Sequence, residues 1–408
     1  MLEQPYFGQR LRALRLGRSL SQAALAGAEM STGYLSRLES GARPPNARIV
    51  RYLAERLGVP LAAFEPDQGP GLAEVLASVT SVPDEDLDEG LTGLLAKALS
   101  ADGRRDPALR WQALWLLARI RGRQGQYEQE FVLLAELSDL AETLRVPELR
   151  ARAYARRSRC ALNLGQVEQA REYAADAVAA ASGLTLPDQA AALLTLVSAE
   201  AEAGWLAQAR AHAEQLCGLA EPAGGAAFTT ALWAAATVAI RQGAYAEATK
   251  LMDRALENLD SHQDLALWLR LRLASASLQL QIVPPQTDDA RAALEHIGPA
   301  LELIGTEVHR QEALVVRAHL AYEEGDLDRS RELCAEAAAW DVKLSFRDRT
   351  RLQMLEGKLD ILAHRTDQGV QRMRDLAEQA HAARHVELAA EIWRSLAETL
   401  EERRRSRS

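Results

Sequence analysis

Apolar residues along this chain recur mainly at spacings of three and four, the pattern that one buried face of an α-helix produces. In Leu20–Gly41 this pattern is divided into two short segments. Ser21 can accept an amide hydrogen bond as N-cap of the first segment, and Ser31 or Thr32 can cap the second. Gly41 provides a C-terminal stop. The stretch therefore predicts two short helices joined by a tight turn.

The second predicted helix has two different faces. Leu35 and Leu38 lie three residues apart and are expected to point inward. The small or polar residues expected to face outward are Thr32, Gly33, Ser36 and Arg37. Two helices joined by a short turn, with a polar face on the second, are typical of a helix-turn-helix motif.

The wider segment Phe7–Phe64 resembles the five-helix DNA-binding domain of the lambda repressor/Cro-like (XRE) family. The motifs that carry the resemblance are Arg10-Leu11-Arg12, Leu20-Ser21-Gln22, Leu25-Ala26, Leu35-Ser36-Arg37-Leu38-Glu39, Gly41, Pro44, Leu53-Ala54 and Leu57-Gly58-Val59. Asn46 is expected to cap the fourth helix, and Pro60 to begin the fifth. The resemblance implies that residues 1–66, here called the head, bind double-stranded DNA. The alternative is a small helical bundle with no nucleic-acid role.

The same resemblance implies roles for individual residues of the head. The residues expected at the phosphate backbone are Gln22, Ser31, Tyr34 and Arg43. The residues expected to face the major groove are Thr32, Gly33, Ser36 and Arg37. Arg37 is the only long donor there, and arginine commonly binds guanine through two parallel hydrogen bonds. Gly33 departs from the family pattern because it has no side chain to contact a base. Tyr34 can equally pack against the first helix, and Glu39 is expected to pair with an arginine inside the head.

A repeated pattern begins at Pro107. In each unit a helix ends in glycine, an apolar or aromatic residue follows shortly, and small residues then recur at spacings of three and four. The turn glycines are Gly125, Gly165, Gly204, Gly243 and Gly325. A further unit has Pro285 at its turn, and a weaker copy surrounds Arg365 and Thr366. Each unit is one helical hairpin that cannot bury its apolar face alone, so the units must stack.

The units resemble tetratricopeptide (TPR) repeats, although their period is about 40 residues rather than ~34. We therefore expect an all-α protein, with a five-helix helix-turn-helix domain followed by an α-solenoid of TPR-like helical hairpins. The expected divisions are residues 1–66 for the head, 67–106 for a linker and connecting helices, 107–384 for the repeats, and 385–408 for a capping helix with a basic tail. The tail is expected to begin at Arg403.

Stacked hairpins leave a concave surface lined by the first helix of each unit. Alignment of the units on their turns predicts these groove positions: Trp115, Arg119, Arg152, Arg159, Asn163, Ser198, Trp233, Thr237, Arg272, Gln279, His319 and Tyr322. Aromatic anchors mixed with arginine and hydrogen-bonding groups are typical of a peptide-binding groove. A solvated helix face would give the same pattern.

A head of this kind joined to such repeats resembles the RRNPP peptide-sensing regulators. The resemblance implies a transcription regulator that binds a short peptide in its groove and changes its DNA binding. Those receptors often hold the peptide backbone with several asparagines, whereas here only Asn163 is suitably placed. The competing hypothesis is a scaffold whose repeats bind another protein while the head tethers it to DNA. Because no dimer seam is visible in the head, the repeats are expected to form a homodimer.

The charge distribution is consistent with this division. Residues 1–67 contain nine arginines and six acidic residues, whereas the remainder contains 39 basic and 51 acidic residues. A basic domain on an acidic body fits a DNA-binding protein whose body avoids DNA. Cys160, Cys217 and Cys334 are few and far apart, which predicts buried free thiols rather than disulfides or a metal site.

No catalytic motif occurs in the sequence, so we expect neither enzymatic activity nor a cofactor. His381 and His385 lie four residues apart on a predicted helix, but no third metal ligand follows at a recognisable spacing. A surface or interhelix role is expected for both histidines. No signal peptide opens the chain, and no apolar run of about 18 residues occurs. These observations predict a cytoplasmic protein without a membrane partner.

Overall fold

The regular structure of this protein is helical throughout the residues that the structure describes. The computed structural model describes residues 4–64, 71–82, 89–102, 106–340 and 344–405. The chain divides into two units, Met1–Glu74 and Val75–Ser408, and each is described by itself. Residues 67–70 of the predicted linker lie outside the described ranges. The expectation of an all-α fold is confirmed.

The first unit contains short helices that begin at side-chain caps. Its elements are α1 (Tyr6–Gly17), α2 (Gln22–Ala26), α3 (Thr32–Glu39), α4 (Ala47–Leu57) and the 3-10 helix η1 (Leu61–Phe64). Ser21, Ser31 and Asn46 each accept a hydrogen bond from the amide three residues later, and so cap α2, α3 and α4. The three caps satisfy amides that have no partner within their helices. The predicted fifth helix is the 3-10 helix η1.

These helices pack around one apolar core. Fully buried members of the core include Phe7, Leu11, Leu25, Leu35, Leu38, Leu53 and Phe64. Gly8 allows α1 to approach α3 closely, because a Cβ at this position would lie 2.3 Å from the carbonyl oxygen of Leu38. The core and this close approach fix the orientation of α3 within the unit.

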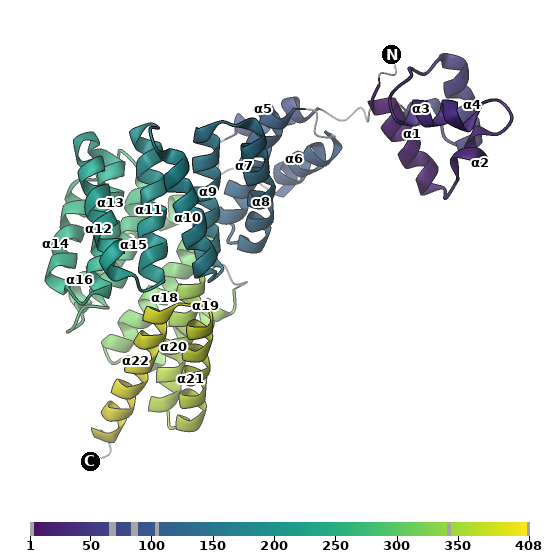
Figure 1. The fold of residues 1–408 in the computed structure, drawn as a ribbon. Coiled ribbons are helices and arrows are strands. Elements are labelled where there is room, and N and C mark those ends of the chain that lie inside the picture. The colour runs from purple at the N-terminus through teal and green to yellow at the C-terminus, as the bar shows by residue number, and fades with distance from the viewer. Residues whose placement is uncertain (1–3, 65–70, 83–88, 103–105, 341–343, 406–408) are drawn as a thin grey trace. The chain divides into compact units, whose positions relative to one another are not determined.

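The helices that follow form successive pairs (Figure 1). They are α5 (Leu72–Thr80), α6 (Glu89–Ala101), α7 (Pro107–Arg123), α8 (Tyr127–Leu144), α9 (Pro147–Asn163), α10 (Val167–Ala181), α11 (Leu186–Glu202), α12 (Leu206–Ala220), η3 (Glu221–Ala223), α13 (Gly225–Arg241), α14 (Tyr245–Glu257), α15 (Leu265–Gln279), α16 (Thr287–His296), α17 (Gly298–Ile304), α18 (Glu307–Glu323), α19 (Leu327–Ala338), α20 (Phe346–Leu362), α21 (Thr366–Ala382) and α22 (Val386–Arg405). The predicted hairpins are present, including the one that lacks a turn glycine.

Left-handed backbone conformations separate the two helices of most pairs. The turn glycines have φ values of 70° at Gly125, 79° at Gly165, 80° at Gly204, 74° at Gly243 and 83° at Gly325. Glycine adopts such values without the steric penalty that a Cβ brings. His364 takes the same conformation, with φ of 65°, between α20 and α21. The weaker copy of the repeat therefore has the same turn geometry with a different residue.

Successive pairs bury their apolar faces against one another. One buried cluster joins Leu232 of α13, Met252 of α14 and Leu271 of α15. The last helices return to earlier ones, since α20 contacts α9 and α22 contacts α11. A Cβ on Gly165 would lie 2.7 Å from the ring of Phe346 at the start of α20. The repeats therefore wind into a superhelix whose last helices pack against its earlier ones.

The C-terminal end differs from the prediction in one respect. Residues 403–405 were expected in a frayed basic tail, but α22 continues through Arg405. Arginine and glutamate are good helix formers, and a cationic last turn interacts favourably with the helix dipole. Residues 406–408 of the predicted tail lie outside the described ranges.

Substitution of Gly369 tests the close crossing of α20 and α21. A Cβ at Gly369 would lie 2.6 Å from the carbonyl oxygen of Gly357, so Gly369→Ala should force the backbones apart. We expect the free energy of unfolding to fall by about 1–3 kcal/mol, as for other overpacked cores. Scanning calorimetry measures the accompanying decrease in Tm.

Gly218→Ala in α12 is the matched control. A Cβ at Gly218 meets nothing within 4 Å, and alanine should stabilise the helix by about 0.5–1 kcal/mol. Equal Tm values for Gly369→Ala and Gly218→Ala would contradict the inference that α20 and α21 approach closely at Gly369.

Candidate functional site

The outward face of α3 is open to solvent. The exposed residues of this helix include Thr32, Gly33, Ser36 and Arg37. Leu35 and Leu38 are 0% exposed, which confirms the predicted division into two faces. At Gly33 a Cβ would meet nothing within 4 Å, so the fold does not require glycine there.

A buried ion pair connects α1 with α3. Arg15 Nε donates to Glu39 Oε1 at 2.6 Å, and its Nη2 donates to Oε2 at 3.1 Å. Gln22 Nε2 donates to the same carboxylate at 2.8 Å. The hydrogen bonds that Arg15 donates to Glu39 raise the pKa of Arg15, although burial opposes this. The predicted pairing of Glu39 is confirmed, and Gln22 uses part of its hydrogen-bonding capacity inside the unit.

The loop after α3 is tied to the N-terminal residues. Gln4 Nε2 donates to the carbonyl oxygens of Leu38 at 3.0 Å and Arg43 at 2.7 Å. The guanidinium carbon of Arg43 lies 4.8 Å from the centroid of the Tyr34 ring. Tyr34 also packs against the apolar core, in agreement with the packing role that was one of the two predicted for it. Arg43 and the cap Ser31 are both exposed.

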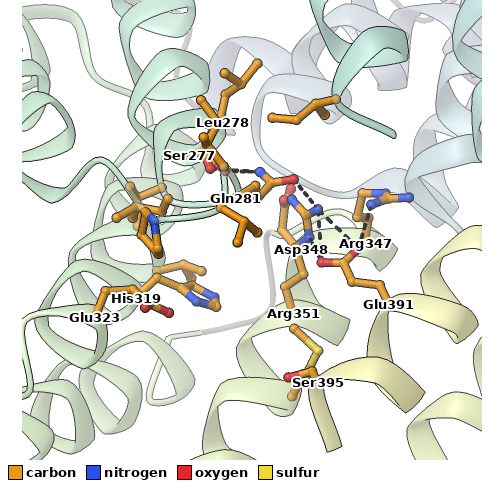
Figure 2. A pocket seen from close by; sticks show the side chains of 18 of the residues that line it. Ser277, Leu278, Gln281, His319, Glu323, Arg347, Asp348, Arg351, Glu391 and Ser395 are labelled. Carbon is orange, nitrogen blue, oxygen red and sulfur yellow. Dashed lines mark hydrogen bonds and ion pairs between the residues drawn. The ribbon is translucent and has the colours of Figure 1, made fainter. Parts of the chain in front are cut away.

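The second unit encloses a cavity of about 780 Å³. Its lining comes from α13, the start of α14, α15, α18, α20 and α22, together with the segment that follows α15. Figure 2 shows His319 and Glu323 on one side, and Arg347, Arg351 and Glu391 on the other. A cavity of this size can hold a ligand of several hundred daltons.

The cavity brings together some of the predicted groove residues. Those that line it are Trp233, Thr237, His319 and Tyr322. Those that do not line it are Trp115, Arg119, Arg152, Arg159, Asn163, Ser198, Arg272 and Gln279. The four lining residues come from α13 and α18, whose units were aligned on turn glycines.

Helix α15 presents other residues to the cavity than those predicted. Arg270 and Ser277 line the cavity, whereas Arg272 and Gln279 do not. The guanidinium of Arg272 instead lies 4.8 Å from the centroid of the Trp268 ring. This unit lacks a turn glycine, so its alignment on Pro285 did not define which face of α15 points inward.

Predicted positions in the earlier repeats have local partners. Arg152 Nε donates to Asp188 Oδ1 at 2.8 Å, across to the next helix pair. The rings of Trp115 and Trp111 stack with centroids 5.2 Å apart and an interplanar angle of 12°. These side chains are used for contacts within and between repeats.

Charged side chains join the C-terminal helices to the middle of the superhelix. Arg347 Nε of α20 donates to both oxygens of Glu202 at the end of α11, at 3.0 and 3.1 Å. Arg241 at the end of α13 pairs with the same carboxylate. Arg351 Nε donates to Glu391 Oε1 of α22 at 3.2 Å. The group, called here the closing cluster, consists of Glu202, Arg241, Arg347, Arg351, Glu387 and Glu391.

Mutual pairing favours the charged forms of Glu202 and Arg347. Burial alone would raise the pKa of Glu202, but the charges of Arg241 and Arg347 hold it well below its usual value. Burial likewise opposes the charge of Arg347, but the carboxylates of Glu202, Glu387 and Glu391 raise its pKa. Charges removed from water in this way are tolerated only when they are paired and hydrogen-bonded.

The closing cluster was not among the predicted sites, although part of it had a sequence signal. Glu202 and Arg241 lie two residues before the turn glycine of their units, as Asn163 does. A comparison of the residue two positions before each turn glycine would have identified Glu202 and Arg241 as candidates. Arg347 lies in the first turn of α20 and had no comparable signal.

Cys160 and Cys334 are buried and Cys217 is half-buried, all as free thiols. His385 Nδ1 lies 3.2 Å from Glu202 Oε2 and its ring stacks on Phe346, so its interhelix role is confirmed. No three His, Cys, Asp or Glu side chains gather as a metal site within the described residues. Within the same residues, no helix has the length and apolarity needed to cross a membrane.

Comparisons with known proteins identify the first unit. Residues 7–65 match a family model described as a helix-turn-helix domain. No curated protein matches the chain at a significant level. A Rap protein complexed with competence and sporulation factor is 15% identical, with 81% of this chain and 98% of that chain covered and a TM-score of 0.50.

Two further structures match at lower TM-scores. Bacillus thuringiensis PlcR, in complex with the peptide PapR7 and DNA, is 15% identical over 78% of this chain and 98% of that chain, with a TM-score of 0.40. A tetratricopeptide repeat protein from Parabacteroides merdae is 14% identical over 70% and 98%, with a TM-score of 0.47. Residues 7–65 therefore form a helix-turn-helix domain, and the TPR-like helical repeats that follow share the fold of the Rap protein.

Proposed function

We propose that this protein is a sequence-specific DNA-binding transcription regulator whose repeats dimerise and bind a ligand of peptide size. The observation that carries the DNA-binding part is the helix-turn-helix match at residues 7–65, together with the exposed outward face of α3. The second helix of such motifs enters the major groove with its outward residues toward the base edges.

The exposed residues of the head divide into two proposed roles. Thr32, Ser36 and Arg37 face the base edges, and Arg37 provides the bidentate donor that recognises guanine. Ser31 and Arg43 lie beside this face and bind phosphates, which position the head but carry no sequence information. Gln22 contributes to phosphate binding only through the amide hydrogen that Glu39 does not accept.

The ligand-binding part is supported by the cavity. Its volume of about 780 Å³ and its mixed aromatic, polar and charged lining suit a short peptide. The volume is far too small for a folded protein domain, which favours a ligand over a scaffold partner. A bound ligand would change DNA affinity only if it bound one arrangement of the two heads more tightly than the other.

Arg37→Ala tests the assigned DNA face. Loss of one bidentate base contact should weaken operator binding by about 1–3 kcal/mol, while the circular dichroism spectrum is unchanged. The operator is first selected from genomic fragments, and affinity is then measured by fluorescence anisotropy.

Arg51→Ala is the control for charge alone, because Arg51 is exposed on α4 outside the helix-turn-helix pair. It should weaken binding to the operator and to unrelated DNA by the same small factor. An operator affinity of Arg37→Ala equal to that of Arg51→Ala would refute the assignment.

The proposed dimer is tested by light scattering. One head offers few DNA contacts, and domains of this kind bind paired half-sites as dimers. We expect both the full-length chain and residues 72–405 to scatter with twice their chain mass at micromolar concentration. A monomer in residues 72–405 but a dimer in the full-length chain would place the dimer contact in the head instead.

A further inference from the structure

Most cations that line the cavity already have anionic or polar partners. Arg347 and Arg351 are engaged by Glu202 and Glu391 within the closing cluster, and Arg351 Nη2 also donates to Gln281 at 2.6 Å. Lys358 Nζ lies 3.9 Å from the centroid of the Tyr322 ring and 3.9 Å from Glu323 Oε1. An anionic ligand group would therefore have to displace existing pairs.

Several acceptors in the same lining have unused capacity. The Glu312 carboxylate of α18 has no hydrogen-bond or ion-pair partner among the described residues. His319 Nε2, about two turns further along α18, is buried and has no hydrogen-bond partner in the described structure. Asp348 of α20 accepts one hydrogen bond, from Ser345 Oγ to Oδ2 at 2.6 Å. The cavity thus presents three groups that can accept hydrogen bonds from a ligand.

The charges around Glu312 leave a net negative balance. Asp348 faces it from α20, Arg270 from α15, and the Tyr127 hydroxyl lies nearby at the start of α8. Arg270 is the opposing cation, and its guanidinium rests 5.4 Å from the centroid of the Trp233 ring. With both carboxylates ionised, one negative charge remains after Arg270 is counted.

Burial and the Asp348 charge raise the pKa of Glu312 to about 8. Burial lowers the pKa of His319 to about 3, so its imidazole is neutral and can accept a hydrogen bond.

We propose that the cavity recognises a cationic group of its ligand, an ammonium or a guanidinium, at the carboxylates of Glu312 and Asp348. This inference rests on the proposed function, which places a ligand in the cavity. A cationic donor gives the Glu312 carboxylate a partner and offsets the repulsion between the two carboxylates. Trp233 and Tyr322 supply the apolar surface for the rest of the ligand.

The affinity for a cationic ligand should depend on pH. A cationic group binds the ionised Glu312 carboxylate, so the ligand must displace the proton that Glu312 holds in the free protein below about pH 8. Affinity should rise between pH 6.5 and 8.5 and then level off, and binding near neutral pH should release a proton. Calorimetry in buffers of different ionisation enthalpy measures this release directly.

Paired peptide pools test the charge preference with the full-length protein. Random pentapeptides with one position fixed as arginine are compared with identical pools containing citrulline, which keeps the shape and loses the charge. Retention is measured by affinity selection and mass spectrometry at pH 8.5. Wild type should retain the arginine pools roughly tenfold better or more, because a hydrogen bond to a charged partner differs from a neutral one by that order.

Glu312→Gln should abolish this preference, whereas the matched control Glu398→Gln should keep it. Glu398 lines the same cavity from α22, and its substitution removes the same charge. Equal retention of arginine and citrulline pools by wild type overturns this inference alone, and so does a preference that survives Glu312→Gln. Retention of no pool overturns it together with the peptide-sized ligand of the proposed function.

A stability measurement shows whether Glu312→Gln folds and whether Glu312 is the desolvated acid. A carboxyl with a raised folded-state pKa stabilises the fold fully below its unfolded pKa of about 4.5, and this contribution is lost as pH rises through about 8. Glu312→Gln should therefore raise Tm relative to wild type at pH 8.5, and much less at pH 4.5. A difference in Tm that is the same at both pH values contradicts the assignment.

Discussion

The arrangement of the repeats depends on the need of buried charges to find partners. Glu202 is surrounded by protein at the end of α11, and Arg241 from the neighbouring repeat is its local partner. Arg347 approaches the same carboxylate from a helix 145 residues further along the chain. Removal of either partner would leave a charge in a poorly solvated place, which is costly in folded proteins. Helices α20 and α22 are therefore held against the middle of the superhelix rather than continuing the stack outward.

This closure also creates the cavity. A solenoid of helical pairs presents an open concave surface, but here α20 and α22 cover part of that surface and enclose about 780 Å³. Arg347, Arg351 and Glu391 serve both purposes, because they pair with one another and line the cavity. A ligand in the cavity would contact side chains that hold the two parts of the superhelix together. Ligand binding in the cavity and the packing of α20 and α22 against the superhelix are thus linked, because both involve the same residues.

Local features of the fold were predictable from the sequence, and its long-range geometry was not. The caps at Ser21 and Ser31 and the glycine turns depend on interactions within a few residues, so spacing alone identifies them. Which residues of α15 line the cavity depends on the rotation that the superhelix has accumulated by that repeat. The spacing of the interhelix turns in the sequence does not encode this rotation. Arg270 was therefore missed and Arg272 selected in its place. The contact of Arg347 with Glu202 joins repeats that are distant in sequence, and no local sequence pattern predicts it.

Hydrogen–deuterium exchange of α22 tests the role of the closing cluster most directly. Amide protection reports the free energy of local opening, segment by segment. Glu202→Gln removes the carboxylate that Arg241, Arg347 and His385 share. Exchange in this variant should be faster in α22 and in the first turns of α20, and unchanged in α7 and α8. Unchanged protection of α22 in this variant would contradict the claim that the closing cluster holds the superhelix closed.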